Sequence, residues 1–337
     1  MARKGGWRRT GPKGRFRYLD SRGNRITDEA KLARIETLVI PPAWKDVWIS
    51  PRASAKLQAT GVDRAGRRQY LYHPEYRARQ EQAKYDKLIQ FAEALPAFRA
   101  AMAEHMERDT HDRLRVSAIA VRLMNQTWFR PGSERSVRES RTYGVTTLTR
   151  RHVSVRGTKI AFSFRGKHKV IVRTALVDSE LAEAMRDLLE LPGSGRVFRY
   201  DEDGTILNLH SRRLNEYIQE YLGEAFSAKD FRTWGGTLAA AIAFAERDPP
   251  ESETEATRVV AAVMRRVADR LGNTPAVTRG SYVSPAVVEQ YLDGRTIEDF
   301  RPRHLRIVGA RDISLDLEEQ ALLSLLRSWR IRRARAA

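Results

Sequence analysis

Four short hydrophobic runs, separated by turn residues, occupy the first part of the chain. Their residues are mostly aromatic or β-branched, and Gly, Pro and Asn stand between them. Runs of this kind are typical of β-strands in a small sheet. They lie at 16–19, 37–40, 47–50 and 69–72.

The hydrophobic pattern changes near Pro74. From there to Thr127 the apolar residues recur at helical spacing, with breaks predicted at Pro96 and at 108–112. The change predicts a β-rich domain over 1–79 and a second domain over 80–337.

The second domain opens with helices and then returns to short β-type runs, which predict a small antiparallel sheet. The runs lie at 145–149, 152–156, 160–164 and 170–173, with a hairpin turn at 165–168. Further helices are predicted beyond them, several ending at Gly or Pro, followed by a basic tail at 327–337 that we expect to be frayed. These helices lie at 179–191, 211–222, 233–246, 253–271, 285–292 and 315–330. The predicted fold class is therefore α+β: a small β-rich N-terminal domain and a mainly helical domain carrying a small antiparallel sheet.

Charge and composition narrow the possible functions. The chain has 61 Lys and Arg against 42 Asp and Glu, a net charge of +19, and 50 of the cations are Arg. Because a guanidinium can grip phosphate oxygens bidentately, this balance favours a nucleic-acid partner.

Several classes of protein are excluded by residues that are missing from the sequence. There is no Cys, no HExxH, no P-loop and no GxGxxG, which argues against disulfides, zinc hydrolases, P-loop ATPases and Rossmann enzymes. The sequence contains no run of about 18 apolar residues, so no membrane span is predicted. We expect a cytoplasmic protein that needs neither a metal nor a cofactor.

Four segments could together transfer a phosphodiester without a metal. Such chemistry needs a nucleophile, fixed cations around the non-bridging oxygens, and an acid for the leaving oxygen. The segments are Phe-Arg-Pro-Gly at 129–132, Gly-Lys-His-Lys at 166–169, Lys-Asp-Phe-Arg-Thr-Trp-Gly at 229–235, and Gly-Asn-Thr-Pro at 272–275, the last followed by Tyr282.

In this order, the segments resemble the catalytic array of the small type IB DNA topoisomerases of bacteria and poxviruses. Pro-Pro-Ala-Trp at 41–44 and Gln-Tyr-Leu-Tyr at 69–72 also resemble the family's N-terminal DNA-clamp domain. The resemblance implies a fold like that of the tyrosine recombinases and type IB topoisomerases. It further implies a monomer, associated with the nucleoid, that relaxes supercoiled double-stranded DNA without ATP or metal.

The resemblance also implies roles for five residues. Tyr282 would be the nucleophile that forms a 3′-phosphotyrosyl link, and Arg130 and Arg232 would hold the scissile phosphate. Lys167, at a hairpin tip, would be the general acid for the 5′-oxygen. Asn273 stands where many relatives have His; its amide can donate a hydrogen bond but cannot act as an acid.

DNA contacts outside the catalytic array are implied for four residues. Gln69, Tyr70 and Tyr72 match the relatives' groove-contacting strand, and Lys229 flanks the N-terminus of the helix predicted at 233–246. Ser133 stands where poxvirus members carry a Lys near the bases, so their site preference does not carry over to this chain.

Two alternatives remain beside a topoisomerase. A tyrosine site-specific recombinase shares the chemistry, but recombinases usually present His-x-x-Arg where this chain has Lys229-x-x-Arg232. A DNA-binding protein with an inactive array would show the same strong, salt-dependent affinity for DNA.

Overall fold

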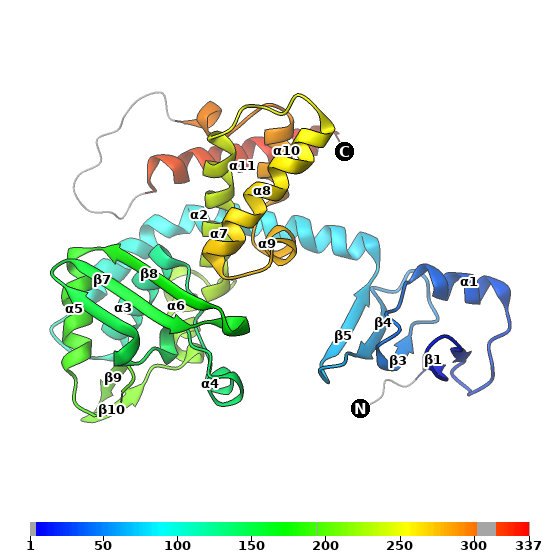
Figure 1. Ribbon diagram of the computed structural model, residues 1–337, viewed down its shortest axis with the longest axis horizontal. Coiled ribbons are helices and arrows are strands. Elements are labelled where there is room, and N and C mark those ends of the chain that lie inside the picture. The colour runs from blue at the N-terminus through cyan, green and yellow to red at the C-terminus, as the bar shows by residue number, and fades with distance from the viewer. Residues whose placement is uncertain (1–4, 194, 302–314, 337) are drawn as a thin grey trace. The chain divides into compact units, whose positions relative to one another are not determined.

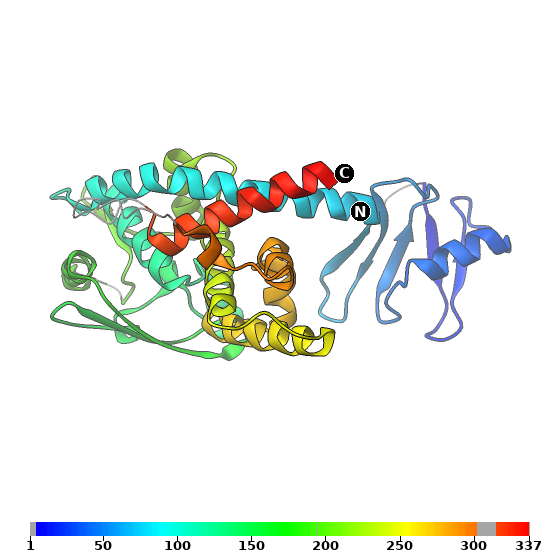
Figure 2. The same cartoon turned by 90° about the horizontal axis from the view of Figure 1, so that it is seen from above.

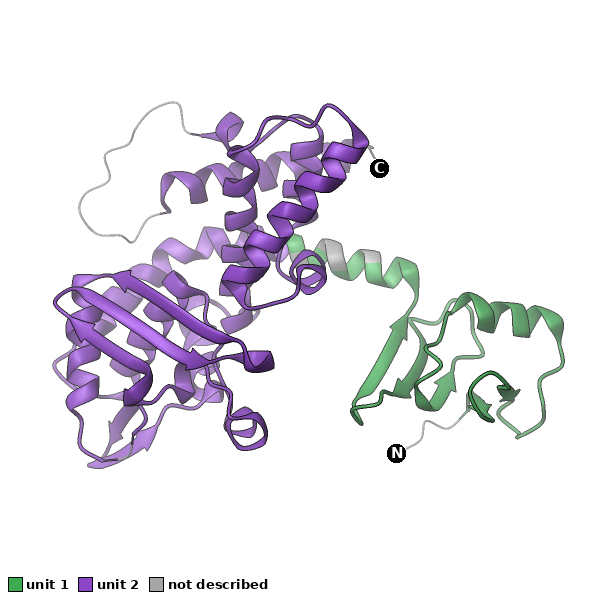
Figure 3. Cartoon of the chain, in the orientation of Figure 1, with its two compact units in different colours: residues 1–85 green, residues 86–337 purple. Residues whose placement is uncertain are grey.

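The computed structural model describes residues 5–193, 195–301 and 315–336. The chain forms two compact units, Met1–Tyr85 and Asp86–Ala337 (Figure 3). The boundary between them and the boundary expected at 79 both lie within the long helix α2 (Pro74–Met106).

The first unit is built on an antiparallel sheet with the strand order β2-β1-β3-β4-β5. Helix α1 (Glu29–Thr37) belongs to the same unit (Figure 1). The strands are β1 (Trp7–Thr10), β2 (Arg17–Leu19), β3 (Lys45–Ile49), β4 (Leu57–Val62) and β5 (Arg68–Tyr72). The core of the unit consists of buried apolar side chains from α1, the strands and the adjoining loop: Trp7, Ile26, Ile35, Val47, Ile49 and Ala59.

The strand predicted at 37–40 is wrong. Asp28 caps a helix here, because its carboxylate accepts a hydrogen bond from the Lys31 amide at 2.9 Å. That helix ends at Thr37, and Val39 then adopts a left-handed φ of 45° with its side chain 80% exposed. Leu38 and Ile40 instead pack against the core of the unit, so the hydrophobic run marks a turn anchored on both sides. Strands β1 and β4 were not predicted.

The second unit carries the three-stranded antiparallel sheet β6-β7-β8 that the sequence predicts. Strand β7 (Lys159–Arg165) pairs with both β6 (Val153–Arg156) and β8 (Ile171–Val177). Ile160, Phe162 and Phe164 alternate along β7 and are buried in the main core. Helix α5 (Ser179–Glu190) packs on β6 and β7. The α+β class is confirmed.

A helical core forms the rest of the second unit. Helix α7 (Ala228–Ala245) is its centre, since most of its residues are buried. It begins at Ala228, not at 233 as predicted, because Ser227 and Asp230 form a capping box. The other helices and the small hairpin of this unit are α3 (Arg113–Thr127), α4 (Glu134–Ser140), β9 (Arg199–Glu202), β10 (Thr205–Asn208), α6 (Ser211–Leu222), α8 (Glu253–Leu271), α9 (Pro275–Ser281), α10 (Pro285–Leu292) and α11 (Leu317–Ala336).

Two further predictions of local structure are wrong. Helix α2 continues through Pro96, since one missing helical hydrogen bond is outweighed by the burial of Phe91, Leu95 and Phe98 around it. The run at 145–149 begins as a 3₁₀ turn, Val145–Thr147, and not as a strand. Its apolar residues pack in the core. A buried turn therefore has the same hydrophobic composition as a buried strand, and the sequence pattern does not distinguish them.

The expectation of a frayed tail at 327–337 is wrong for 327–336, because α11 extends to Ala336; residue 337 lies outside the described residues. This helix runs antiparallel to α2 (Figure 2). Near its start, the buried Glu319 accepts hydrogen bonds from Arg99 at 2.8 Å and from the Trp234 indole at 2.9 Å. Further along, Arg327 pairs with Glu93 at 2.6 Å. The C-terminal helix is thereby attached to both α2 and α7. Across the described ranges, no helix combines the length and apolar character needed to cross a bilayer.

Candidate active site

Arg130 lies on a tightly held loop after α3. The helix ends when Trp128 adopts a left-handed conformation, φ 56°. The loop is then fixed by hydrogen bonds from the Val145 amide to the Arg130 carbonyl at 2.9 Å and from Thr146 to the Pro131 carbonyl at 2.8 Å. Gly132 has φ 88°, and a Cβ there would lie 2.7 Å from the Thr147 hydroxyl. The glycine in Phe-Arg-Pro-Gly is therefore required by the backbone.

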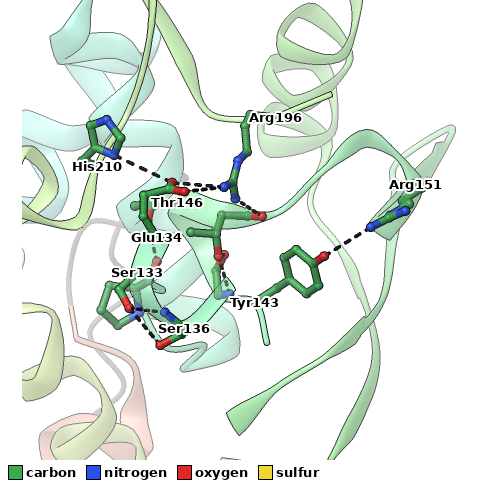
Figure 4. A network of polar contacts seen from close by, with 11 residues as sticks. Ser133, Glu134, Ser136, Tyr143, Thr146, Arg151, Arg196 and His210 are labelled. Atoms are coloured by element: carbon green, nitrogen blue, oxygen red, sulfur yellow. Dashed lines mark hydrogen bonds and ion pairs between the residues drawn. The ribbon is translucent and has the colours of Figure 1, made fainter. Parts of the chain in front are cut away.

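A polar network supports this loop from the side of α4 (Figure 4). Arg196 donates to both carboxylate oxygens of Glu134, at 2.8 and 3.0 Å, and to the Thr147 carbonyl at 2.5 Å. Ser133 caps α4 through the Ser136 amide at 3.2 Å. The network joins the start of α4 to the 3₁₀ turn that holds Arg130, so the Arg130 backbone is fixed from two sides.

Arg232 is the most deeply buried cation of the candidate site, with 3% of its surface exposed. It projects from α7 and donates to the Leu271 carbonyl at 2.7 Å and to the Trp128 carbonyl. Burial, and then the neighbouring charge of Arg130, lowers its pKa to about 10. It therefore remains a cation at neutral pH, held by two carbonyls and by no carboxylate within the described residues.

The Gly-Asn-Thr-Pro segment is a helix end followed directly by a helix start. Gly272, φ 61°, ends α8, and the Asn273 amide bonds back to the Ala268 carbonyl at 2.9 Å. Thr274 then caps α9, with Pro275 at its first position. This arrangement fixes the Asn273 side chain beside the loop of Arg130.

Asn273 contacts Arg130 directly: its Oδ1 accepts a hydrogen bond from Arg130 Nη2. Its Nδ2 is buried and has no hydrogen-bond partner in the part of the chain that the structure describes. An unpaired buried donor is costly unless a ligand supplies an acceptor. The amide thus orients Arg130 with its oxygen and offers its nitrogen to a bound group.

Tyr282 stands at the end of α9, and 7% of its surface is exposed. Its carbonyl accepts from the Thr237 hydroxyl at 3.3 Å. Gly236 allows this approach, since a Cβ there would lie 2.7 Å from the same carbonyl. The Arg232 guanidinium lies 5.1 Å from the centre of the Tyr282 ring, and Lys229 Nζ lies 6.0 Å from it.

Electrostatics favour the ionised form of Tyr282. Burial alone would raise the pKa of its phenol, but the charges and hydrogen bonds of Arg232 and Arg130 outweigh burial and bring the pKa below its ordinary value. A tyrosine that loses its proton more readily is a better nucleophile at neutral pH.

We expect Arg130→Gln to raise the pKa of Tyr282, because one of the two cations that favour the phenolate is removed. The measurement is an NMR titration of protein labelled at tyrosine Cζ, with Tyr282→Phe used to assign the resonance. Arg135→Gln is the control, since Arg135 is exposed and paired with Glu139. A Tyr282 resonance that titrates above pH 10 in the wild type, or that does not respond to Arg130→Gln, would contradict this account.

Lys167 lies in the turn between β7 and β8, as the sequence predicts for a hairpin tip. Its side chain is exposed, and the next two residues, His168 and Lys169, have left-handed φ angles of 60° and 63°. Lys167 lines a cavity of about 440 Å³ together with Arg130 and Arg232. Neither Asn273 nor Tyr282 is among the lining residues of that cavity. The structure therefore brings Arg130, Arg232, Asn273 and Tyr282 together and places Lys167 across a shared cavity.

The residues expected to contact DNA from the first unit lie on β5. Tyr70 and Tyr72 point to the same exposed face, with their rings stacked 6.2 Å apart. The Gln69 amide is instead bonded to Asp63 at 2.8 Å. Tyr76, in the first turn of α2, extends this aromatic group, since its ring lies 5.3 Å from that of Tyr72.

Sequence reasoning missed two structural features of the site. The Trp128 carbonyl receives Arg232, and the Trp128 ring lies against Gly235, where a Cβ would come within 2.1 Å of it. Trp128 and Gly235 belong to the Trp-Phe-Arg-Pro-Gly and Thr-Trp-Gly-Gly segments, but nothing in the sequence predicts that these two segments are in contact. Within the described residues, no cluster of three His, Asp or Glu side chains is suited to hold a metal ion.

Comparison with known proteins agrees with this geometry. The family model described as the catalytic core of eukaryotic DNA topoisomerase I matches residues 73–300, and the model of the N-terminal domain of bacterial DNA topoisomerase IB matches residues 15–63. DNA topoisomerase 1B of Acanthamoeba polyphaga mimivirus is 30% identical over 84% of this chain and 86% of its own length. DNA topoisomerase I of monkeypox virus is 21% identical over 77% of this chain and 78% of its own length. DNA topoisomerase 1 of rabbit fibroma virus is 23% identical over 70% of this chain and 72% of its own length. The chain belongs to the type IB DNA topoisomerase family.

Proposed function

We propose that this enzyme relaxes supercoiled double-stranded DNA through a covalent bond to Tyr282. The phenolic oxygen attacks a backbone phosphorus, the P–O5′ bond breaks, and a 3′-phosphotyrosyl link and a free 5′-hydroxyl form. The observation that carries the proposal is the burial of the Tyr282 phenol beside Arg130 and Arg232, with its pKa lowered by them.

The surrounding groups have separate tasks in this step. Arg130 and Arg232 neutralise the charge that develops on the non-bridging oxygens, and Asn273 Nδ2 donates to one of them. The phenol proton leaves to solvent, and Lys167 supplies a proton to the 5′-oxygen. Religation is the same exchange in reverse.

The exchange requires no external energy source. One phosphodiester is formed for each one broken, so cleavage and religation are nearly balanced, and the strain of the supercoil sets the direction. We therefore propose that neither ATP nor a metal takes part. We also propose that a monomer suffices, and that the enzyme works in the cytoplasm on the nucleoid.

The experiment is relaxation of a negatively supercoiled plasmid in EDTA without ATP, followed by detergent trapping on a nicked duplex. The expected adduct is on the peptide that contains Tyr282, with the 3′ end of the DNA attached. An adduct on another peptide, or at a 5′ end, would contradict the mechanism. Relaxation of one plasmid by dilute protein without partner sites further separates this activity from recombination.

We expect Lys167→Ala to slow cleavage strongly on ordinary DNA, by about 10²–10⁴-fold, because proton transfer to the leaving oxygen is lost. When sulfur replaces the leaving 5′-oxygen, the thiolate departs without a proton, so the variant is expected to cleave nearly as fast as the wild type. Single-turnover cleavage of both substrates is the measurement. Lys169→Ala, two residues away in the same turn, is the control and should show no difference between substrates. Equal defects on both substrates would remove Lys167 from the acid role.

A further inference from the structure

The cavity beside the candidate site has an excess of positive charge that the proposed mechanism does not use. Five cationic side chains line it, against the single carboxylate of Asp269. Three of these cations, Arg130, Lys167 and Arg232, already have roles. The remaining two are Arg173 and Arg270.

Arg270 is held in a defined position by an aromatic ring. It lies in the last turn of α8, and its guanidinium carbon is 4.0 Å from the centre of the Trp128 ring. The indole is itself 8% exposed and pressed against Gly235, so the surface under the guanidinium is rigid. Arginine stacked on tryptophan in this way keeps its hydrogen-bond donors free at the edges.

Arg270 also lacks the counter-ion that two other arginines of α8 have. Arg258 pairs with Glu255 and Arg266 pairs with Glu246. Over the ranges that the structure describes, no carboxylate forms an ion pair with Arg270. Burial against the indole, and then the charge of Arg266, lowers the pKa of Arg270. Arg270 is an exposed residue, so its guanidinium is accessible to an anion, and a phosphate can supply the partner that the described residues do not.

Trp128 joins Arg270 to the candidate catalytic groups. Its carbonyl accepts from Arg232, it stands two residues before Arg130, and Arg270 stands three residues before Asn273. We propose that Arg270 binds a DNA backbone phosphate adjacent to the scissile phosphate, and that Trp128 is the residue that positions it. The inference rests on the proposed function, because it names a second point at which the same DNA strand is held.

The test uses single neutral methylphosphonates, placed in turn at each phosphate flanking the cleavage position. With wild-type protein, neutralising the phosphate that Arg270 contacts is expected to slow single-turnover cleavage by about tenfold or more. In Arg270→Ala the rate on unmodified DNA falls by a similar factor, and that methylphosphonate causes no further loss. If every flanking methylphosphonate slows Arg270→Ala as much as it slows the wild type, the proposal is overturned.

Binding supplies a second readout, measured in the Tyr282→Phe background so that no cleavage occurs. Arg270→Ala is expected to reduce the slope of log affinity against log salt concentration by about 0.9, the value for one lost phosphate contact. Arg270→Lys keeps the charge and is expected to keep the slope. Arg258→Ala, which removes an equal charge about 18 Å away along α8, is the control for general electrostatics. An unchanged slope in Arg270→Ala, or an equal reduction in Arg258→Ala, would contradict the contact.

The two failures can be distinguished. If wild-type protein forms no adduct at Tyr282, the proposed function is wrong. If the adduct forms normally and Arg270→Ala matches Arg258→Ala in rate and salt slope, only the role of Arg270 is wrong.

Discussion

Tyr282→Phe is expected to abolish plasmid relaxation and the covalent adduct. Affinity for duplex DNA is expected to change by less than about threefold, because the substitution removes one hydroxyl and no charge. The change deletes only the oxygen that would attack phosphorus. The ring keeps its place, because it is held by burial and by the backbone contact of Tyr282 with Thr237. The measurements are relaxation, detergent-trapped adduct and equilibrium binding on the same duplex.

Tyr291→Phe provides the matched control. Tyr291 is buried nine residues further on, and its hydroxyl donates to the Asp248 carbonyl at 2.8 Å. Removing that hydroxyl is expected to lower the free energy of unfolding by about 1 kcal/mol and to leave relaxation unchanged. If Tyr282→Phe retains more than about one part in a thousand of wild-type activity, another nucleophile must be present and the mechanism fails.

The candidate site could be predicted from sequence where its residues sit in short, local motifs. Asn273 and Tyr282 are separated by one helix of seven residues, so the spacing in the chain already places them close together. Lys167 was predicted at a hairpin tip because two β-type runs flank Gly166, and the structure has that hairpin.

The parts that could not be predicted depend on contacts between distant segments. Arg232 is one arginine among fifty, and nothing local to α7 indicates that it is buried. Its burial arises because the ends of α3 and α8 each present a carbonyl to it, from Trp128 and Leu271. Contacts between distant segments also explain why the C-terminal tail is helical. Its basic residues suggested fraying, but Glu319 of α11 accepts hydrogen bonds from Arg99 and Trp234 and so attaches the helix to the core.

Arg232→Gln is expected to reduce the single-turnover rate of cleavage by about 10²–10³-fold, the effect of losing one preorganised donor to a developing anion. It should also raise the pKa of Tyr282, since Arg232 is the strongest of the charges that lower it. The substitution has a structural cost as well. The Trp128 and Leu271 carbonyls lose a charged donor, so we expect the free energy of unfolding to fall by about 2–4 kcal/mol.

Arg199→Gln separates the structural cost from the catalytic one. Arg199 is 2% exposed and, like Arg232, donates to two backbone carbonyls, those of Leu191 and Pro192 at 2.6 and 2.5 Å. It does not line the cavity that Arg130, Lys167 and Arg232 share. Both variants should therefore lose similar stability in denaturant unfolding, but only Arg232→Gln should lose cleavage measured well below its unfolding temperature. Equal losses of cleavage in the two variants would mean that Arg232 acts through the stability of the fold, and its place at the scissile phosphate would have to be given up.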